Sequence, residues 1–456
     1  MSLIPQDRSK LSPMMQQYLS MKDEHRDQIL MFRLGDFYEM FFDDAVTASR
    51  ELELTLTGRD CGLPDRAPMC GVPYHSVENY IARLVKKGYK VAICEQMENP
   101  ALAKGMVKRD IVRVVTPGTL MEANMLEEGS NNYICSLCPA GERCGLAFAD
   151  ISTGSVLVTE VSGEMAAINE LGKYVPHEVI YAEELPQLRS VVGFLKDRLC
   201  CAAQAGDRDA YTEETAKKLV TEQFGADTVT RLAGTPLAVR ALGGLMAYLR
   251  VTQFTGLERL LEAKSYLPQE YMRLDVAARR NLELTETMRS REKRGTLFWV
   301  LDKTKTSMGR RLLRSSIEQP LLSVNAINRR LNAVTELTRN SILISELAAA
   351  LDGVYDLERL MTRVVYGNPP VKDMIALGAT TARLPAIKEL LGEVQCALLR
   401  EIEQNIDPLE DVARLIGSAI DPDSDIPLKE GGVIREGYDK QLDEARHLSK
   451  DIRGIL

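Results

Sequence analysis

The spacing of apolar residues changes near Ala241, and this change constrains the fold more than any other feature of the sequence. Before Ala241, short apolar runs typical of strands alternate with stripes at helical spacing. After Ala241, nearly every segment carries its apolar residues at helical spacing. The 456 residues correspond to about three domains at roughly 150 residues per domain. The sequence therefore predicts a multidomain chain of α/β domains followed by an all-α region.

The first 117 residues predict a mixed α/β domain. Gly35-Asp36 separates the first strand from a second helix, and Pro117-Gly118 closes the domain. The pattern predicts helices over 11–27, 37–52 and 77–85, and strands over 28–33, 89–94 and 111–116. Residues 118–131, which include an acidic stretch, predict a linker.

Residues 132–241 predict a three-layer α/β domain, because three short strands joined by turns precede helices that alternate with a further strand. The expected strands are 133–137, 146–151, 155–161 and 177–181. Residues 242–430 predict a helical domain, and residues 431–456 form a separate short segment. The charged helix expected over 438–453 stops without a cap or a partner, a pattern that suggests a truncated chain.

The charges are segregated along a chain whose formal net charge is −8. Residues 83–113 hold eight basic and three acidic residues, and residues 271–340 hold fifteen basic and seven acidic residues. Basic stretches of this kind suit a polyanion, although solvated helix faces explain them equally well. In the second stretch, five arginines lie among apolar helix positions, and we expect them to pair with acidic residues: Arg279, Arg280, Arg310, Arg311 and Arg314.

Several kinds of chemistry find no support in the sequence. No run of about 18 apolar residues could span a membrane, and the start of the chain lacks a signal-peptide pattern, so we expect a cytoplasmic protein. Cys135, Cys138 and Cys144 have a metal-like spacing but lack a fourth ligand, which favours a packing role. The P-loop motif is absent, and no catalytic constellation stands out. We therefore expect no enzymatic activity, no metal and no cofactor in these residues.

One segment carries the most information. Arg33-Leu-Gly-Asp-Phe-Tyr-Glu-Met-Phe-Phe-Asp-Asp-Ala resembles the amino-terminal signature of the MutS family of bacterial DNA mismatch-repair proteins. Pro68-Met-Cys-Gly-Val-Pro-Tyr-His-Ser resembles the next signature of that family. Further segments resemble the family in the same order, including Gly295-Thr-Leu-Phe-Trp-Val-Leu-Asp and Gly432-Val-Ile-Arg-Glu-Gly-Tyr-Asp. The resemblance covers essentially the whole chain.

The resemblance implies roles for two residues. Phe37 would wedge into the minor groove beside a mispaired base, and Glu39 would hydrogen-bond that base. A mismatched step has lost pairing and stacking energy, so it is easier to kink than a matched step. The alternative for Phe37 is an ordinary core aromatic at a strand-to-helix junction.

Other residues are secondary candidates for contacts with the DNA backbone. By resemblance, the loop containing Met69, Tyr74 and His75 would touch DNA around the kink, although it could equally be packed against its own domain. Arg59, Lys108 and Arg109 are plausible phosphate partners, or else solvated surface charges.

The resemblance also implies a domain plan and partners. The plan is a mismatch-binding domain, a ribonuclease-H-like connector, a helical lever core and the start of a clamp arm. A carboxy-terminal ATPase that uses ATP and Mg²⁺ would lie beyond Leu456. The implied partners are double-stranded DNA with mismatches or small loops, a second copy of the chain and a MutL-type repair protein, with the protein at the nucleoid.

Two rival functions remain. A metal-dependent nuclease on the connector would need clustered carboxylates, of which Asp150 is the one strand acid that suggests such a site. A MutS relative that binds recombination intermediates would have no use for the pair of Phe37 and Glu39.

Overall fold

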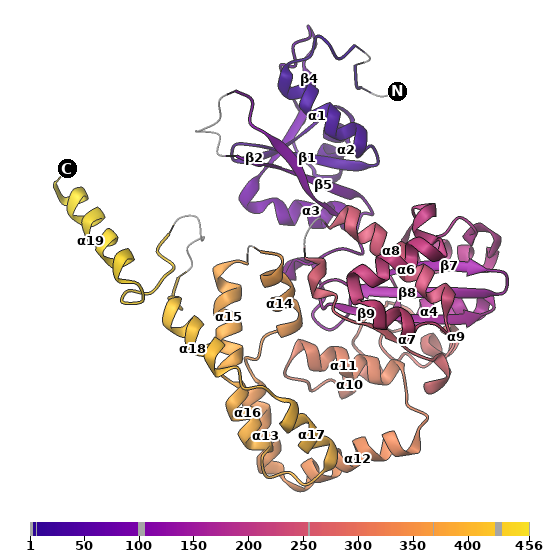
Figure 1. Ribbon diagram of the computed structural model, residues 1–456. Coiled ribbons are helices and arrows are strands. Elements are labelled where there is room, and N and C mark those ends of the chain that lie inside the picture. Colours follow the sequence, from indigo (N-terminus) through magenta and orange to yellow (C-terminus); the bar gives the residue numbers. More distant parts are fainter. Residues whose placement is uncertain are drawn as a thin grey trace. The chain divides into compact units, whose positions relative to one another are not determined.

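The computed structural model describes residues 3–5, 7–98, 105–253, 256–367, 369–424 and 431–455 (Figure 1). The chain forms two compact units. The first unit comprises Met1–Glu127 with Asn131–Leu267, and the second comprises Glu128–Ser130 with Pro268–Leu456. Both β-sheets belong to the first unit. Within the described ranges, every helix is too short or too polar to cross a lipid bilayer.

The first sheet has six strands in the order β3-β4-β2-β1-β5-β6. Strands β1 and β5 are parallel, and the other neighbours are antiparallel. Helix α1 packs on one face, while α2 and α3 pack on the other. The elements are α1 Pro13–Glu24, β1 Gln28–Leu34, β2 Phe37–Phe41, α2 Phe42–Leu52, β3 Thr57–Arg59, β4 Ala67–Pro73, η1 Tyr74–Ser76, α3 Val77–Lys86, β5 Lys90–Gln96, β6 Arg109–Val115 and η2 Ala123–Met125.

The helix predicted over 37–52 is wrong in its first five residues, because Phe37–Phe41 forms strand β2. Gly35 adopts a φ of +58°, and the two-residue turn 35–36 pairs Leu34 with Phe37 in a hairpin. The apolar run misled the prediction because β2 carries apolar residues on both faces, with Tyr38 and Met40 on one and Phe37 and Phe41 on the other, and periodicity does not separate such a run from a helix.

The second sheet has the order β11-β10-β7-β8-β9-β12. Strands β7, β8 and β9 form an antiparallel meander, and β10 and β11 extend it in parallel beside β7. The elements are β7 Ile134–Ala140, β8 Arg143–Asp150, β9 Ser155–Ser162, α4 Glu164–Tyr174, β10 Glu178–Tyr181, η3 Leu185–Gln187, α5 Arg189–Phe194, η4 Leu195–Leu199, β11 Ala202–Ala205, η5 Arg208–Tyr211, α6 Glu213–Phe224, α7 Ala226–Arg231, α8 Pro236–Thr252, η6 Leu257–Arg259 and β12 Ala263–Ser265.

The domain boundary expected at residue 241 falls inside α8 and needs correction. Helix α8 packs against β7, β8 and β10. At Gly145 in β8 the helix comes so close that a Cβ would lie 2.0 Å from the carbonyl oxygen of Leu237. Strand β12 then pairs with β9, so the α/β part of the chain continues to Leu267.

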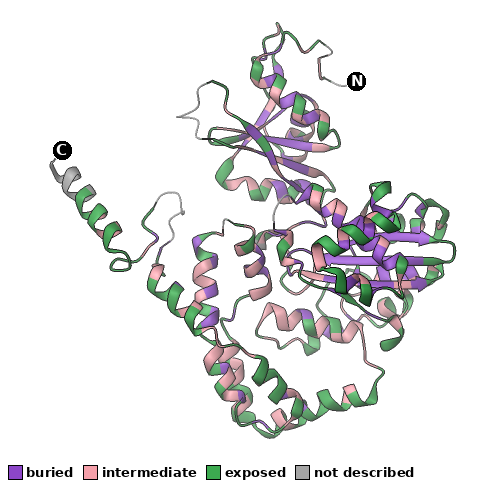
Figure 2. Ribbon diagram, in the orientation of Figure 1, coloured by how far each residue is buried: buried purple, intermediate pink, exposed green. Residues whose placement is uncertain are grey.

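The second unit is built mainly from helices, and Figure 2 shows that most of their surface is exposed or half-buried. A small core joins several of them around Ile387, Leu391 and Leu399. The apolar spacing over 374–391 predicts one helix, but the structure has two, because Pro385 lies in the first turn of α16. The Pro-, Gly- and Asp-rich stretch 421–432 predicts a loop, of which residues 425–430 lie outside the described residues.

The helices of this unit are η7 Pro268–Glu270, α9 Val276–Asn281, α10 Leu297–Leu301, α11 Ser307–Glu318, α12 Val324–Arg339, α13 Ser341–Leu351, α14 Leu357–Val365, α15 Val371–Thr381, α16 Leu384–Leu391, α17 Ala397–Asn405, α18 Glu410–Ala419 and α19 Lys440–Ile455.

Candidate functional site

Most of the candidate residues gather at one end of the first sheet, which we call the turn end. Strand pairing defines it, because Phe37 lies opposite both Leu34 and Pro73, and Gln96 lies opposite Arg109. Strands β1 and β5 run in parallel, so Leu34 and Gln96 end on the same side. Residues separated by more than 70 positions in the sequence therefore meet at one edge.

Phe37 is exposed at the turn end. Its side chain is 47% exposed, whereas the next residue, Tyr38, is 4% exposed. Tyr38 points into the core beneath α2 and α3, and Phe37 belongs to neither of the two cores of this domain. Phe37 is therefore not the core aromatic of the alternative interpretation, and its ring is free to meet a ligand.

Glu39 lies on the same face of the sheet as Phe37, two residues further along β2. It is opposite Gly71 of β4, and its carboxylate accepts a hydrogen bond from Arg59 Nη1 of β3 in an ion pair. Arg59, which we considered as a phosphate partner, is thus engaged with the other main candidate. Sequence reasoning did not predict this contact, because it depends on the pairing of three strands.

Arg109 is 8% exposed and its guanidinium is held inside the protein. Its Nε donates to the carbonyl of Arg33 at 2.9 Å, its Nη1 donates to Gln17 Oε1 at 3.1 Å, and it lies 4.9 Å from the ring of Phe32. Burial lowers the pKa of Arg109, and the charge of Arg59 lowers that pKa further. Arg109 thereby connects β1 and α1 near the turn end, and its buried guanidinium offers little surface to a phosphate.

Lys108 precedes β6 at the turn end, and its side chain is exposed. Its backbone N–H donates to Glu98 Oε1 at 2.7 Å. Its ammonium group is therefore the better placed of the two neighbouring cations to reach a phosphate. Lys104, which contributes to the same basic stretch, lies outside the described residues.

The loop candidates fall on both faces of the sheet. Met69 is half-buried on the face that carries Phe37, where it lies opposite Phe41. Tyr74 follows β4, and its backbone N–H donates to the carbonyl of Asp36 at 2.9 Å in the hairpin turn. His75 meets the Tyr74 ring edge-on at 5.9 Å. Tyr74 and His75 therefore brace the turn that precedes Phe37.

A cluster that the sequence analysis missed lies behind this turn. The Arg33 guanidinium lies 3.9 Å from the centre of the Tyr74 ring and 3.8 Å from the Glu95 carboxylate. Tyr38 donates a hydrogen bond to Glu95. Burial, together with this carboxylate, raises the pKa of Tyr38, so the phenol remains a donor. The cluster fixes the strand on which Phe37 and Glu39 are carried.

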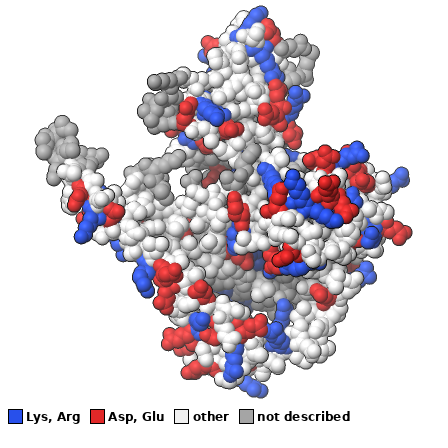
Figure 3. All heavy atoms as spheres, in the orientation of Figure 1, with Lys and Arg blue, Asp and Glu red and all other residues white. Residues whose placement is uncertain are grey.

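Several charged side chains elsewhere are paired. Positive and negative groups lie interspersed on the face shown in Figure 3. Arg311 pairs with Asp356 and Glu358, Arg310 with Asp302, and Arg314 with Glu318, as expected for the helical part of the chain. The local surplus of basic residues between 271 and 340 is therefore partly neutralised within the fold.

The second sheet provides little for catalysis. Asp150 is fully buried, and its carboxylate accepts hydrogen bonds from Ser152, Asn131 and Asn132 in a turn. Burial raises the pKa of Cys138 to about 11 and that of Cys144 to about 12, so both stay protonated. The described residues contain no group of three or more His, Cys, Asp or Glu that could hold a metal ion.

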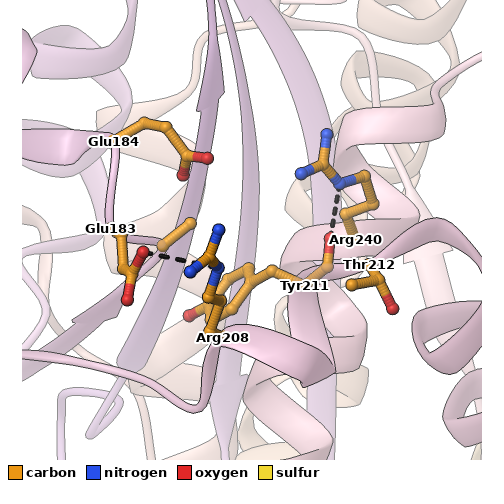
Figure 4. A pocket seen from close by; sticks show the side chains of 7 residues that line it. Glu183, Glu184, Arg208, Tyr211, Thr212 and Arg240 are labelled. Atoms are coloured by element: carbon orange, nitrogen blue, oxygen red, sulfur yellow. Dashed lines mark hydrogen bonds and ion pairs between the residues drawn. The ribbon is translucent and has the colours of Figure 1, made fainter.

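One small pocket opens beside the ends of β10 and β11 (Figure 4). Its volume is about 100 Å³, well below that of a usual ligand site. Arg208 pairs with Glu183 at 3.5 Å, and Arg240 donates to the carbonyl of Tyr211 at 2.5 Å. These internal contacts satisfy the pocket's two cations, so it is a weak candidate for substrate binding.

Three family models match the chain in order. MutS domain I matches residues 12–124, MutS domain II matches residues 132–260, and MutS domain III matches residues 277–454.

Several curated proteins are similar over almost all of this chain. The DNA mismatch repair protein MutS of Alkaliphilus oremlandii is 48% identical over 442 residues, which are 95% of this chain and 50% of that protein. The protein of the same name from Ruminiclostridium cellulolyticum is 47% identical over 444 residues, which are 96% of this chain and 50% of that protein. The chain thus spans about half the length of the curated relatives it matches.

Proposed function

The chain belongs to the MutS family, and from that membership we propose that it recognises mispaired or unpaired bases in duplex DNA. The observation that carries the proposal is the placement of an exposed aromatic ring, Phe37, at the turn end with Glu39 beside it on the same face. Residues of the second signature surround this pair.

Phe37 would act as a wedge from the minor-groove side. A mismatched step is easier to unstack and kink than a matched step, so insertion of a ring costs less there. Stacking of an aromatic ring on a base contributes about 1–3 kcal/mol and accepts any base. The two-residue turn and the Arg33–Tyr74 contact hold the strand that carries the ring, which limits the entropy lost on insertion.

Glu39 would hydrogen-bond the displaced base, which can present a free donor. A matched pair offers no such donor, because its Watson–Crick groups are engaged. Glu39 therefore gains no hydrogen bond from matched DNA and gains one from a mismatch, which favours the mismatched duplex. Lys108 and the edge residues around it would contribute affinity without sequence information.

The remaining parts of the proposal rest on the family. Residues 131–267 would form the connector, and a ribonuclease-H-like sheet there is supported by the strand order β11-β10-β7-β8-β9-β12, in which an antiparallel meander is extended by parallel β10 and β11. The helices after Pro268 would form the lever core, with α19 at the start of a clamp arm. A second copy of the chain and a MutL-type protein are the proposed partners. The 456 residues contain no P-loop, so the proposal assigns ATP chemistry to none of them.

The test is a binding measurement with the Phe37→Ala variant. Fluorescence anisotropy compares a duplex that contains one G·T mismatch or an unpaired T with its matched counterpart. We expect the unmutated chain to prefer the mismatched duplex, and we expect Phe37→Ala to lose that preference because the stacking contribution is removed. By the magnitude of base stacking, the loss should be about tenfold or more.

Val46→Ala serves as the matched control. Val46 is also an exposed apolar residue of this domain, but it lies on α2, which covers the opposite face of the sheet. This variant should bind both duplexes as the unmutated chain does. Equal binding of the two duplexes, unaffected by Phe37→Ala, would contradict the proposal and indicate a binder of DNA backbone or junctions.

A further inference from the structure

The ion pair between Arg59 and Glu39 joins two strands that are not neighbours. Arg59 ends β3 and Glu39 lies in the middle of β2, with β4 between them. Their side chains are 38% and 15% exposed, so the pair lies at the surface of the face that carries Phe37. A contact across an intervening strand requires that both side chains extend over it.

Gly71 provides the space for this contact. It lies on β4 directly opposite Glu39, and a Cβ at this position would lie 3.4 Å from Glu39 Cγ and 3.3 Å from the carbonyl oxygen of Tyr38. The distance to the carbonyl oxygen is tighter than ordinary van der Waals contact and the distance to Glu39 Cγ is at its lower limit, so a side chain larger than alanine would press on Glu39. The absence of a side chain lets Glu39 lie over β4 towards Arg59.

The other nearby cation does not compete for Glu39. Arg109 lies close enough to Arg59 for the charge of Arg59 to lower the pKa of Arg109. The Arg109 guanidinium is buried, however, and donates to Arg33 and Gln17. Among the residues that the structure describes, Glu39 forms an ion pair with Arg59 alone. The orientation of the Glu39 carboxylate in the DNA-free protein therefore depends on one side chain.

We propose that Arg59 holds Glu39 away from the DNA until a mispaired base offers it a donor, which makes Arg59 a positioning residue that sets mismatch specificity. This inference rests on the proposed function. A matched duplex leaves the ion pair intact and meets a neutralised carboxylate. A mismatched duplex separates Glu39 from Arg59. The free energy of the ion pair therefore opposes the binding of mismatched DNA and does not affect the binding of matched DNA.

The proposal makes a directional prediction for Arg59→Met, which keeps the apolar stem of the side chain and removes the charge. An exposed ion pair changes an equilibrium by about 2- to 5-fold. The ratio of the dissociation constants for matched and G·T duplexes should therefore rise about 2- to 5-fold, because mismatch binding no longer breaks the pair. Fluorescence anisotropy at fixed salt measures both constants.

Two further variants make the result specific. Arg66→Met removes an exposed cation from the same hairpin, and it should leave the ratio unchanged. In a Glu39→Gln background, Arg59→Met should also leave the ratio unchanged, because no ion pair remains to be broken. A rise that persists in the Glu39→Gln background would overturn the proposal.

Other roles of Arg59 predict different outcomes. A plain phosphate contact would weaken both duplexes equally, leave the ratio unchanged and reduce the salt slope by about 1. If Arg59 instead oriented Glu39 for its hydrogen bond to the base, Arg59→Met would lower the ratio of the dissociation constants for matched and G·T duplexes. Either result overturns the proposal.

A measurement without DNA separates this proposal from the proposed function. Hydrogen exchange over residues 28–73 of the DNA-free chain should lose protection about 2- to 5-fold in Arg59→Met and show no further loss when Glu39→Gln is already present. Absence of this coupling would overturn the proposal that Arg59 holds Glu39. Coupling in a chain that does not distinguish the two duplexes would instead overturn the proposed function.

Discussion

Three consecutive residues of β2 have different environments, because successive side chains of a strand point to opposite faces of the sheet. Phe37 and Glu39 face outward beside β4, and Tyr38 is buried beneath α2 and α3. Tyr38 donates to Glu95, which is also close to Arg33, so the buried face fixes the backbone that the exposed face uses. The strand that carries Phe37 and Glu39 is thus positioned by the contacts of Tyr38.

The turn before Phe37 gives a prediction at the scale of one residue. Gly35 has a φ of +58°, and a Cβ at this position would meet no atom within 4 Å. Gly35→Ala should therefore cost about 1–2 kcal/mol through backbone strain alone, and Gly35→Asn should cost less because asparagine tolerates this region. Hydrogen exchange over residues 28–41 measures the difference.

Gly417→Ala is the control for this prediction. Gly417 lies in α18, has open space around its Cα and does not appear among the residues with positive φ. Alanine there should be neutral or stabilising, since alanine is the better helix former. Equal protection of the hairpin in Gly35→Ala and Gly35→Asn would show that the turn does not hold Gly35 in the left-handed region.

Sequence reasoning at the residue scale reached the candidates but not their contacts. The family signature selected Phe37 and Glu39, and composition selected Arg59 as a surface cation. The pairing of Arg59 with Glu39 was not predictable, because the two residues lie 20 positions apart and meet only through the register of β4. Arg109 looked like a surface charge for the same reason: its acceptors lie in α1 and β1.

At the scale of elements, the sequence predicted helices with a regular apolar stripe better than short strands. The helix predicted over 77–85 agrees with α3, Val77–Lys86, because its apolar stripe is regular and Gly88 follows it with a positive φ. The prediction of a helix over Phe37–Phe41 is wrong, because five residues with apolar side chains on both faces do not reveal the period of a strand. The connection from β2 to α2 adds to this ambiguity, since α2 begins directly after β2, at Phe42, whose φ is +52°.

A buried ion pair between α11 and α14 gives a prediction for pH. Burial alone would raise the pKa of Asp356, but hydrogen bonds and charge from Arg311 outweigh it and hold the pKa below the ordinary value of 3.8. An acid with a lowered folded pKa stabilises the fold above its unfolded pKa and loses that contribution as the pH falls. The stability of the second unit should therefore drop as the pH falls below about 4.

The chain's single tryptophan, Trp299, lies in α10 and reports on this unit by fluorescence during urea unfolding. Asp356→Asn should be less stable at pH 7 and should show a shallower decline towards pH 3. Asp352→Asn, a change at an exposed aspartate before α14, should follow the unmutated chain. An unchanged pH profile in Asp356→Asn would assign the acid sensitivity to other carboxylates.

At the scale of the whole molecule, a net charge of −8 is compatible with DNA binding because basic and acidic residues are unevenly distributed along the chain, although some of them pair within the fold. Helical arginines pair with acids inside the second unit, and Arg59 pairs with Glu39 at the turn end. Long-range attraction to DNA should therefore be modest, and selectivity should depend on the deformation of the duplex.

Several contacts join the two sheets of the first unit, and one of them is made by a buried carboxylate. Glu178 of β10 is fully buried and accepts hydrogen bonds from Thr116 Oγ1, from the backbone N–H of Gly118 at 3.2 Å and from the Tyr248 hydroxyl at 2.6 Å. Gln253 of α8 adds a donor to the carbonyl of Val114 at 3.2 Å. These contacts connect β6 and the segment after it to the second sheet, so a displacement of β6 can affect that sheet.

Tyr248→Phe should loosen this joint. It leaves one oxygen of a buried carboxylate without its donor, a loss of about 1–3 kcal/mol. Exchange should quicken in both residues 109–120 and 176–182, because Glu178 links them, and mismatch affinity should fall while Phe37 is untouched. Tyr181→Phe, three residues along the same strand, removes a hydroxyl that does not contact Glu178 and should change neither. Faster exchange in 176–182 alone would mean that Glu178 stabilises its own sheet without coupling it to the turn end.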